Sequence, residues 1–151
     1  AIPGWPDGRV ARQRASAMDD PAPPQVLRDG RPLILRLLAG REATNPSGTL
    51  FGGWLLSQMD VAGSVPAMYA CRGRFMTARV DEVRFLQPGK RGDLVSAYAG
   101  IDRVGRTTVH VTVELWVDRR EQSVRIVTGQ LTHVAVDDQG QPRPLPDHGA
   151  L

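Results

Sequence analysis

One segment alternates apolar and polar residues strictly enough to identify a β-strand. Between Thr107 and Asp118, valines and a leucine occupy every second position, with histidine, threonine, glutamate and tryptophan between them. This period of two is typical of a strand with one face against a core. Segments rich in strand-forming residues also predict strands at 32–39, 75–85, 93–102 and 124–136.

A different pattern runs from Leu50 to Cys71, where nearly every residue is apolar or small and Gly52 and Gly53 stand near the start. It predicts one long helix, kinked at Pro66 because proline cannot donate to the preceding turn. The helical period is expected to place Leu55, Met59, Ala62 and Met68 towards the sheet and Asp60, Gly63, Ser64 and Ala67 on an adjacent stripe. Small residues on that stripe would let a partner subunit approach closely.

One helix among five strands predicts an α+β domain in which an antiparallel sheet wraps around a long central helix. Residues 1–27 contain five prolines and no apolar period, so we expect a disordered proline-rich arm there and one folded domain over 28–151. The sequence contains no apolar span of transmembrane length, no recognisable cleavable leader and a single cysteine, Cys71. These features predict a cytoplasmic protein without disulfides.

Charge gives only weak information about partners. The formal net charge is +3, and all basic residues except Lys90 are arginines, which suggests a composition bias. No nucleic-acid-binding motif accompanies the charge, so we expect neither nucleic acid nor membrane as a partner. Basic residues exceed acidic ones by four between Arg72 and Arg106, an excess that suits a phosphate-bearing small ligand or simply a solvated surface.

Asp60 is the one charged residue of the apolar helix. Burying an ionised carboxylate without a partner is costly, which favours a catalytic role over a structural ion pair. Gly52 and Gly53 at the helix start leave backbone N–H groups that attract a developing negative oxygen. Asn45 could bind a water or a carbonyl, although Asn before Pro also initiates loops. Together these groups match the needs of water attack on an acyl carbon.

The remaining reactive side chains are weaker candidates. The histidines, His110, His133 and His148, have neither metal-ligand spacing nor a cysteine companion, so we interpret them as structural or exposed. Cys71 ends the helix, away from any oxyanion motif, and is not expected to be a nucleophile. No metal site is expected.

Four strings carry a resemblance to a known family: TNPSGTLFGGWLLSQMD, GRFMTARVDEVRFLQPGKRGD, VGRTTVHVTVELWV and HVAVDDQGQPRPLP. In order and spacing they resemble the hotdog-fold acyl-CoA thioesterases, most closely the bacterial YciA-type acyl-CoA hydrolases, over about 36–146. The resemblance implies hydrolysis of acyl-CoA to a carboxylic acid and CoA, without metal or organic cofactor. Ser47 and Thr49 depart from the family pattern, which leaves the acyl-chain preference open.

The resemblance also assigns site residues. It makes Asp60 the catalytic carboxylate, as general base or nucleophile, and Asn45 an active-site amide. The helix start at Gly52 and Gly53 would polarise the carbonyl, and Thr77 would line the same pocket. The two halves of the site would come from opposite protomers of at least a homodimer, and we expect a tetramer or hexamer.

The same resemblance places CoA near the turn at 104–107. The residues expected to bind it are Gly105, Arg106 and Thr107, followed by Arg103, Lys90 and Arg91. A non-hydrolytic acyl-CoA-binding sensor on the same fold is the main alternative. A hydratase is disfavoured because it needs a catalytic histidine paired with an acid, and no histidine precedes His110.

Overall fold

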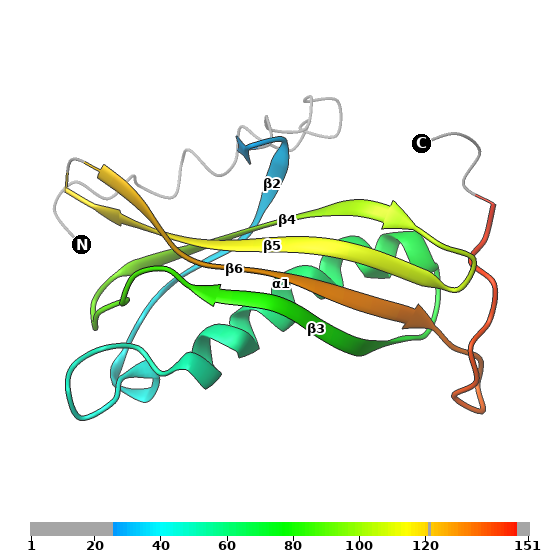
Figure 1. Ribbon diagram of the computed structural model, residues 1–151, viewed down its shortest axis with the longest axis horizontal. Coiled ribbons are helices and arrows are strands. Elements are labelled where there is room, and N and C mark those ends of the chain that lie inside the picture. Colours follow the sequence, from blue (N-terminus) through cyan, green and yellow to red (C-terminus); the bar gives the residue numbers. More distant parts are fainter. Residues whose placement is uncertain (1–25, 121, 148–151) are drawn as a thin grey trace, which may run out of the picture.

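The computed structural model describes residues 26–120 and 122–147. In Figure 1, one long helix, α1 (Gly52–Cys71), lies against one side of a six-stranded sheet. The strands are β1 (Leu27–Arg28), β2 (Arg31–Leu38), β3 (Phe75–Phe85), β4 (Leu94–Val104), β5 (Thr108–Arg119) and β6 (Gln122–Ala135). The predicted α+β arrangement of an antiparallel sheet around a central helix is confirmed, with β1 and the 3-10 turn η3 (Arg41–Ala43) as additions. Most of the predicted arm, residues 1–25, lies outside the described residues.

The strands follow the order β1-β2-β4-β5-β6-β3, and every neighbouring pair is antiparallel. The alternating apolar residues of the central strand β5 are completely buried; they are Val109, Val111, Val113, Leu115 and Val117. They form the middle of the core beneath α1, as the sequence pattern predicts. Strand β3 pairs only with β6 and forms an edge of the sheet, with exposed apolar residues at Met76, Val80 and Phe85.

The helix buries a face that differs in part from the expected one. Met59 is buried as predicted, but Met68 is 49% exposed because nine residues of helix turn it to the opposite side. Gly63 and Ala67, predicted for the adjacent stripe of small residues, are both buried. A Cβ built on Gly63 would lie 3.2 Å from a methyl of Val113 and 3.5 Å from Nε2 of His133. The small residue therefore lets the helix approach its own sheet rather than a partner.

The helix runs from Gly52 to Cys71 with Pro66 inside it. Arg72, in the left-handed conformation at φ 45°, ends it, and its N–H donates to the carbonyl of Met68. Among the described residues, no helix is long and apolar enough to cross a membrane.

Candidate active site

Asp60 lies on the flank of α1 that faces the edge strand β3. Its carboxylate is exposed in the single chain, which contradicts the expectation of a buried charge. The reason is its position: β3 ends the sheet, and no described residue covers the helix beyond it. The Thr77 hydroxyl donates a 2.7 Å hydrogen bond to Asp60 Oδ1. No described residue donates a hydrogen bond to the second oxygen, so the carboxylate is held at one atom and open at the other.

Behind Thr77 lies a histidine that the sequence analysis assigned no role beyond a structural or exposed one. His133 is wholly buried, and its Nδ1 is 3.3 Å from the Thr77 hydroxyl oxygen. Burial lowers the pKa of His133, while the negative charge of Asp60 acts in the opposite direction. The two residues are far apart in sequence, but Thr77 and His133 face each other in the β3–β6 register. Knowledge of that strand pairing would have revealed the connection.

The start of α1 carries unpaired backbone donors. Phe51 occupies the N-cap position and makes no side-chain capping bond, and the first turn has no acidic residue. Within the described part of the chain, the N–H groups of Gly52 and Gly53 have no acceptor. A Cβ on Gly53 would meet nothing within 4 Å, so the approach to its amide is open.

A cavity of about 270 Å³ adjoins this helix start. Residues from the loop before α1, from α1 itself and from the end of β3 line it, and they are Thr49, Leu50, Gly52, Leu55, Phe85, Leu86, Gln87, Pro88 and Gly89. The mixture of apolar walls and backbone donors is typical of ligand sites.

Asn45 forms part of the loop that leads into the helix. Its Oδ1 accepts hydrogen bonds from the N–H groups of Ser47 at 3.0 Å and Thr49 at 3.1 Å, and its Nδ2 donates to Thr49 Oγ1 at 2.7 Å. These bonds stabilise the loop, which is the structural role that an Asn before Pro often has. The second Nδ2 hydrogen has no hydrogen-bond acceptor among the described residues and is free to bind a ligand.

The candidate groups do not all meet within one chain. Gly53 precedes Asp60 by seven residues, which corresponds to about 10 Å along the helix axis. A carbonyl under attack must lie about 3 Å from both its donor and the attacking group. Asp60 therefore cannot attack directly a carbonyl that is bound at the helix start of its own chain.

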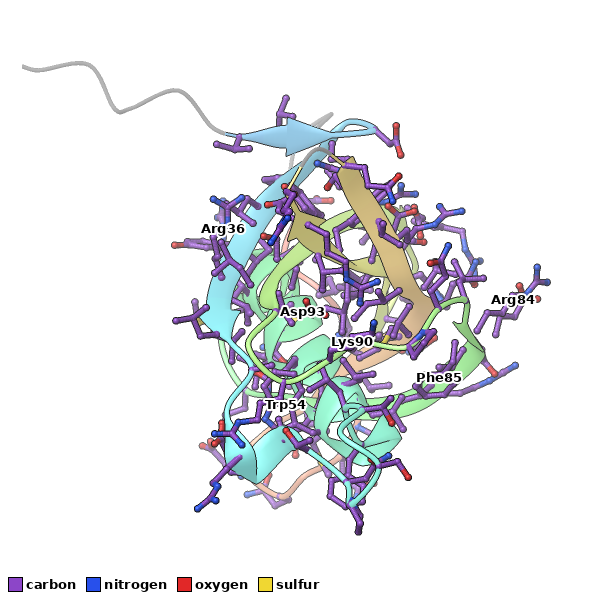
Figure 2. All side chains as sticks on the ribbon, turned by 90° about the vertical axis from the view of Figure 1, so that its left-hand side faces the viewer. Arg36, Trp54, Arg84, Phe85, Lys90 and Asp93 are labelled. Atoms are coloured by element: carbon purple, nitrogen blue, oxygen red, sulfur yellow. The ribbon has the colours of Figure 1, made fainter. Side chains whose placement is uncertain are left out.

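The predicted CoA-binding residues also fall into two groups. Lys90 and Arg91 precede β4, at the end of the sheet where α1 begins; Figure 2 views this end and labels Lys90 and Asp93. Arg103 and Arg106 lie at the other end of β4, in and beside the turn to β5 visible in Figure 1. The 11 residues of β4 span about 35 Å, so one chain keeps the two groups apart.

Neighbouring side chains contact the basic residues at each end of β4. At one end, Asp93 accepts the Lys90 N–H at 2.8 Å and forms a 2.8 Å ion pair with Arg119. Burial alone would raise the pKa of Asp93, but these hydrogen bonds and the charges of Arg119 and Lys90 hold it below its usual range. At the other end, the Arg103 guanidinium lies 3.0 Å from Nε2 of His110.

The turn beyond Arg103 is closed by the Gly105 N–H, which donates to the Thr108 carbonyl at 2.8 Å. The Arg106 side chain is exposed, and its carbonyl accepts the N–H of Leu145 at 2.9 Å. Thr107 accepts through its carbonyl from the Ala135 N–H at 2.9 Å. Among the described residues, no group of three or more histidine, cysteine or acidic side chains could hold a metal ion.

Comparison with known proteins adds independent information. Residues 47–124 match the family model described as the thioesterase superfamily. The chain is 40% identical over 122 residues to the acyl-CoA thioester hydrolase YciA of Salmonella typhimurium, covering 78% of this chain and 92% of that protein. It is 42% identical to the hexameric thioesterase y2039 of Yersinia pestis, with a TM-score of 0.76, covering 81% of this chain and all of that one.

A third relative is an acyl-CoA hydrolase from Staphylococcus aureus, solved with butyryl coenzyme A and coenzyme A. It is 30% identical, with a TM-score of 0.70, and the match covers 74% of this chain and 70% of that one. Two further structures of that hydrolase are of variants in which an asparagine or an aspartate was replaced by alanine, and those positions are 15 residues apart. Asn45 and Asp60 have the same separation in this chain.

Proposed function

Because the chain belongs to the thioesterase superfamily and has the hotdog fold of that family, we propose that it hydrolyses acyl-CoA thioesters to a carboxylic acid and CoA. The observation that carries the proposal is the Asp60 carboxylate, held at one oxygen by Thr77 and open at the other. The relatives named above supply the substrate class, since their names describe acyl-CoA hydrolases.

Asp60 can act in two ways. As a general base it takes a proton from water while the hydroxide adds to the thioester carbonyl carbon; the C–S bond then breaks and the CoA thiolate leaves and is protonated. As a nucleophile it adds to the same carbon and expels CoA, and water then hydrolyses the acyl-aspartyl anhydride. Both routes require the carboxylate form and a donor for the carbonyl oxygen.

That donor is the helix start of a second copy. The roughly 10 Å between Gly53 and Asp60 within one chain is too long for direct attack on a carbonyl held by the chain's own amide. The edge strand β3, with Met76 and Val80 exposed on it, offers a surface that suits association with an identical chain. The named Yersinia relative is hexameric, and a hexamer built from three dimers is the assembly proposed here.

A two-fold axis beside β3 also accounts for the divided basic residues. Across such an axis the strands of the two sheets run in opposite directions. Arg106 of one copy then approaches the end of the other copy that carries Lys90. The phosphates of one CoA would then contact both groups. Arg106 is the first candidate for a phosphate contact because its side chain is exposed and unengaged among the described residues.

The main alternative is an acyl-CoA-binding sensor without hydrolytic activity. A hydratase remains disfavoured, because His133 is wholly buried and cannot reach a substrate. Action without a cofactor and a cytoplasmic location remain predictions from the sequence.

The test measures release of the CoA thiol from acyl-CoAs ranging from acetyl to palmitoyl, with Asp60→Asn beside the wild type. The loss of general-base assistance should lower kcat by about 10²–10⁴-fold. Asp138→Asn is the matched control, since Asp138 is 90% exposed and makes no contact with Asp60 or Thr77. Unchanged hydrolysis by Asp60→Asn contradicts the mechanism, and CoA binding without any release supports the sensor.

A further inference from the structure

A buried imidazole, that of His133, lies behind Thr77. His133 is 0% exposed, its ring meets that of Phe75 edge-on at 5.7 Å, and its Nε2 lies against the Gly63 backbone of α1. Among the described residues, Nε2 is the one buried side-chain nitrogen or oxygen without a hydrogen-bond partner. A polar ring in this apolar position is expected to make a functional hydrogen bond through its other nitrogen, Nδ1.

Counting hydrogens determines which nitrogen carries the proton. A carboxylate only accepts, so the single Thr77 hydroxyl hydrogen is committed to Asp60 Oδ1 at 2.7 Å. The hydroxyl oxygen is then an acceptor towards His133, and the 3.3 Å contact requires a hydrogen on Nδ1. The other tautomer would leave a buried Nε2–H without an acceptor, which is the less favourable of the two arrangements.

The ring is also neutral. A second proton would have to reside on Nε2, where no acceptor is available, and burial lowers the pKa of this histidine. Asp60 is the charged group that acts on the ring from α1, and no charged residue of another described element contributes. A neutral donor can orient the hydroxyl without placing a positive charge beside Asp60, which would make the carboxylate a weaker base.

We propose that His133 is a positioning residue for the thioesterase reaction, whose Nδ1–H orients the Thr77 hydroxyl so that it holds Asp60 Oδ1 and leaves the other carboxylate oxygen for the water or substrate. The proposal rests on the proposed function, in which Asp60 performs the chemistry. His133 touches neither substrate nor reacting atoms; it acts through Thr77.

Two substitutions of His133 separate the effect of hydrogen-bond donation from the effect of side-chain packing. His133→Asn keeps a donor close to the position of Nδ1, whereas His133→Leu fills the space without one. His133→Leu should lower kcat about threefold to tenfold, the effect of one neutral hydrogen bond, with little change in KM. His133→Asn should recover most of that loss. Equal kcat in wild type and His133→Leu, or equal losses in the two folded variants, would overturn the proposal.

A double substitution tests the route. If His133 acts through Thr77, then in a Thr77→Val background His133→Leu should change kcat by less than about twofold. Fully additive losses would mean that His133 acts by another path.

The wild-type enzyme supplies a measurement that requires neither a folded variant nor turnover. The ¹⁵N chemical shifts of the His133 ring should show a protonated Nδ1 and a bare Nε2, and the reverse pattern would refute the inference. If the tautomer is as expected but no acyl-CoA is hydrolysed, the proposed function fails instead. The two failures are therefore distinguishable.

Discussion

Replacing Gly53 by proline should remove the candidate carbonyl donor while preserving the helix. Proline lacks the N–H, and in the first helical turn that group has no intrahelical acceptor to lose. A Cβ at this position meets nothing within 4 Å, so the added Cβ disturbs no packing in either variant. Gly53→Ala is the matched control, because it adds the same Cβ and keeps the N–H.

The magnitude follows from the role of the donor. Loss of one oxyanion donor reduces kcat about 10²–10³-fold, equivalent to about 3–4 kcal/mol of transition-state stabilisation. Neither variant removes a hydrogen bond within the described chain, so both should melt close to the wild-type temperature. The assay is thiol release under saturating acyl-CoA, with thermal unfolding followed by circular dichroism. Equal kcat in Gly53→Pro and Gly53→Ala would refute the assignment.

Mixing variants then tests whether the site is shared between copies. In a dimer of one Gly53→Pro chain and one Asp60→Ala chain, a shared site leaves one of the two sites intact. Random association of equal amounts should restore about a quarter of the wild-type activity, since half of the dimers are mixed. If Gly53 and Asp60 of the same chain worked together, every site would carry one lesion and no activity would return.

Three further predictions concern the surroundings of the site. Thr77→Val should lower kcat about tenfold by removing the hydrogen bond to Asp60, whereas Thr77→Ser should not; steady-state kinetics of both variants decides this, and equal rates contradict it. Arg106→Ala should raise KM for acyl-CoA with little change in kcat, and an unchanged KM removes Arg106 from the binding site. Asp93→Asn should lower the free energy of unfolding at pH 7 by about 2 kcal/mol, measured by urea titration. Because the pKa of Asp93 is lowered in the fold, its contribution is complete above the unfolded pKa of about 4 and is lost as pH falls through the folded pKa. The deficit of Asp93→Asn should therefore shrink as the pH is lowered below about 4, and a deficit that does not change with pH contradicts this.

The sequence predicted the fold well because its signals are local. Alternating valines identify β5, and an unbroken apolar stretch identifies α1, without knowledge of what either contacts. The error at Met68 is also local, since the helical period itself turns that residue away from the sheet.

The site was predicted in part. Asp60, Thr77 and the helix start emerged from composition and resemblance, and the Asp60–Thr77 hydrogen bond joins two of them. His133 was missed because its role depends on β6 pairing with β3, which is not its neighbour along the chain. The basic residues were grouped because they are close in sequence, yet a full-length strand separates Lys90 from Arg106.

The order of elements along the chain has a consequence for biosynthesis. Helix α1 leaves the ribosome before β5 and β6, the strands that supply most of the core beneath it. During that interval its apolar side has no cover, and the central strand of the sheet does not yet exist. Folding must therefore wait until nearly the whole domain has been synthesised, which makes the nascent chain a natural client for chaperones that bind exposed apolar segments.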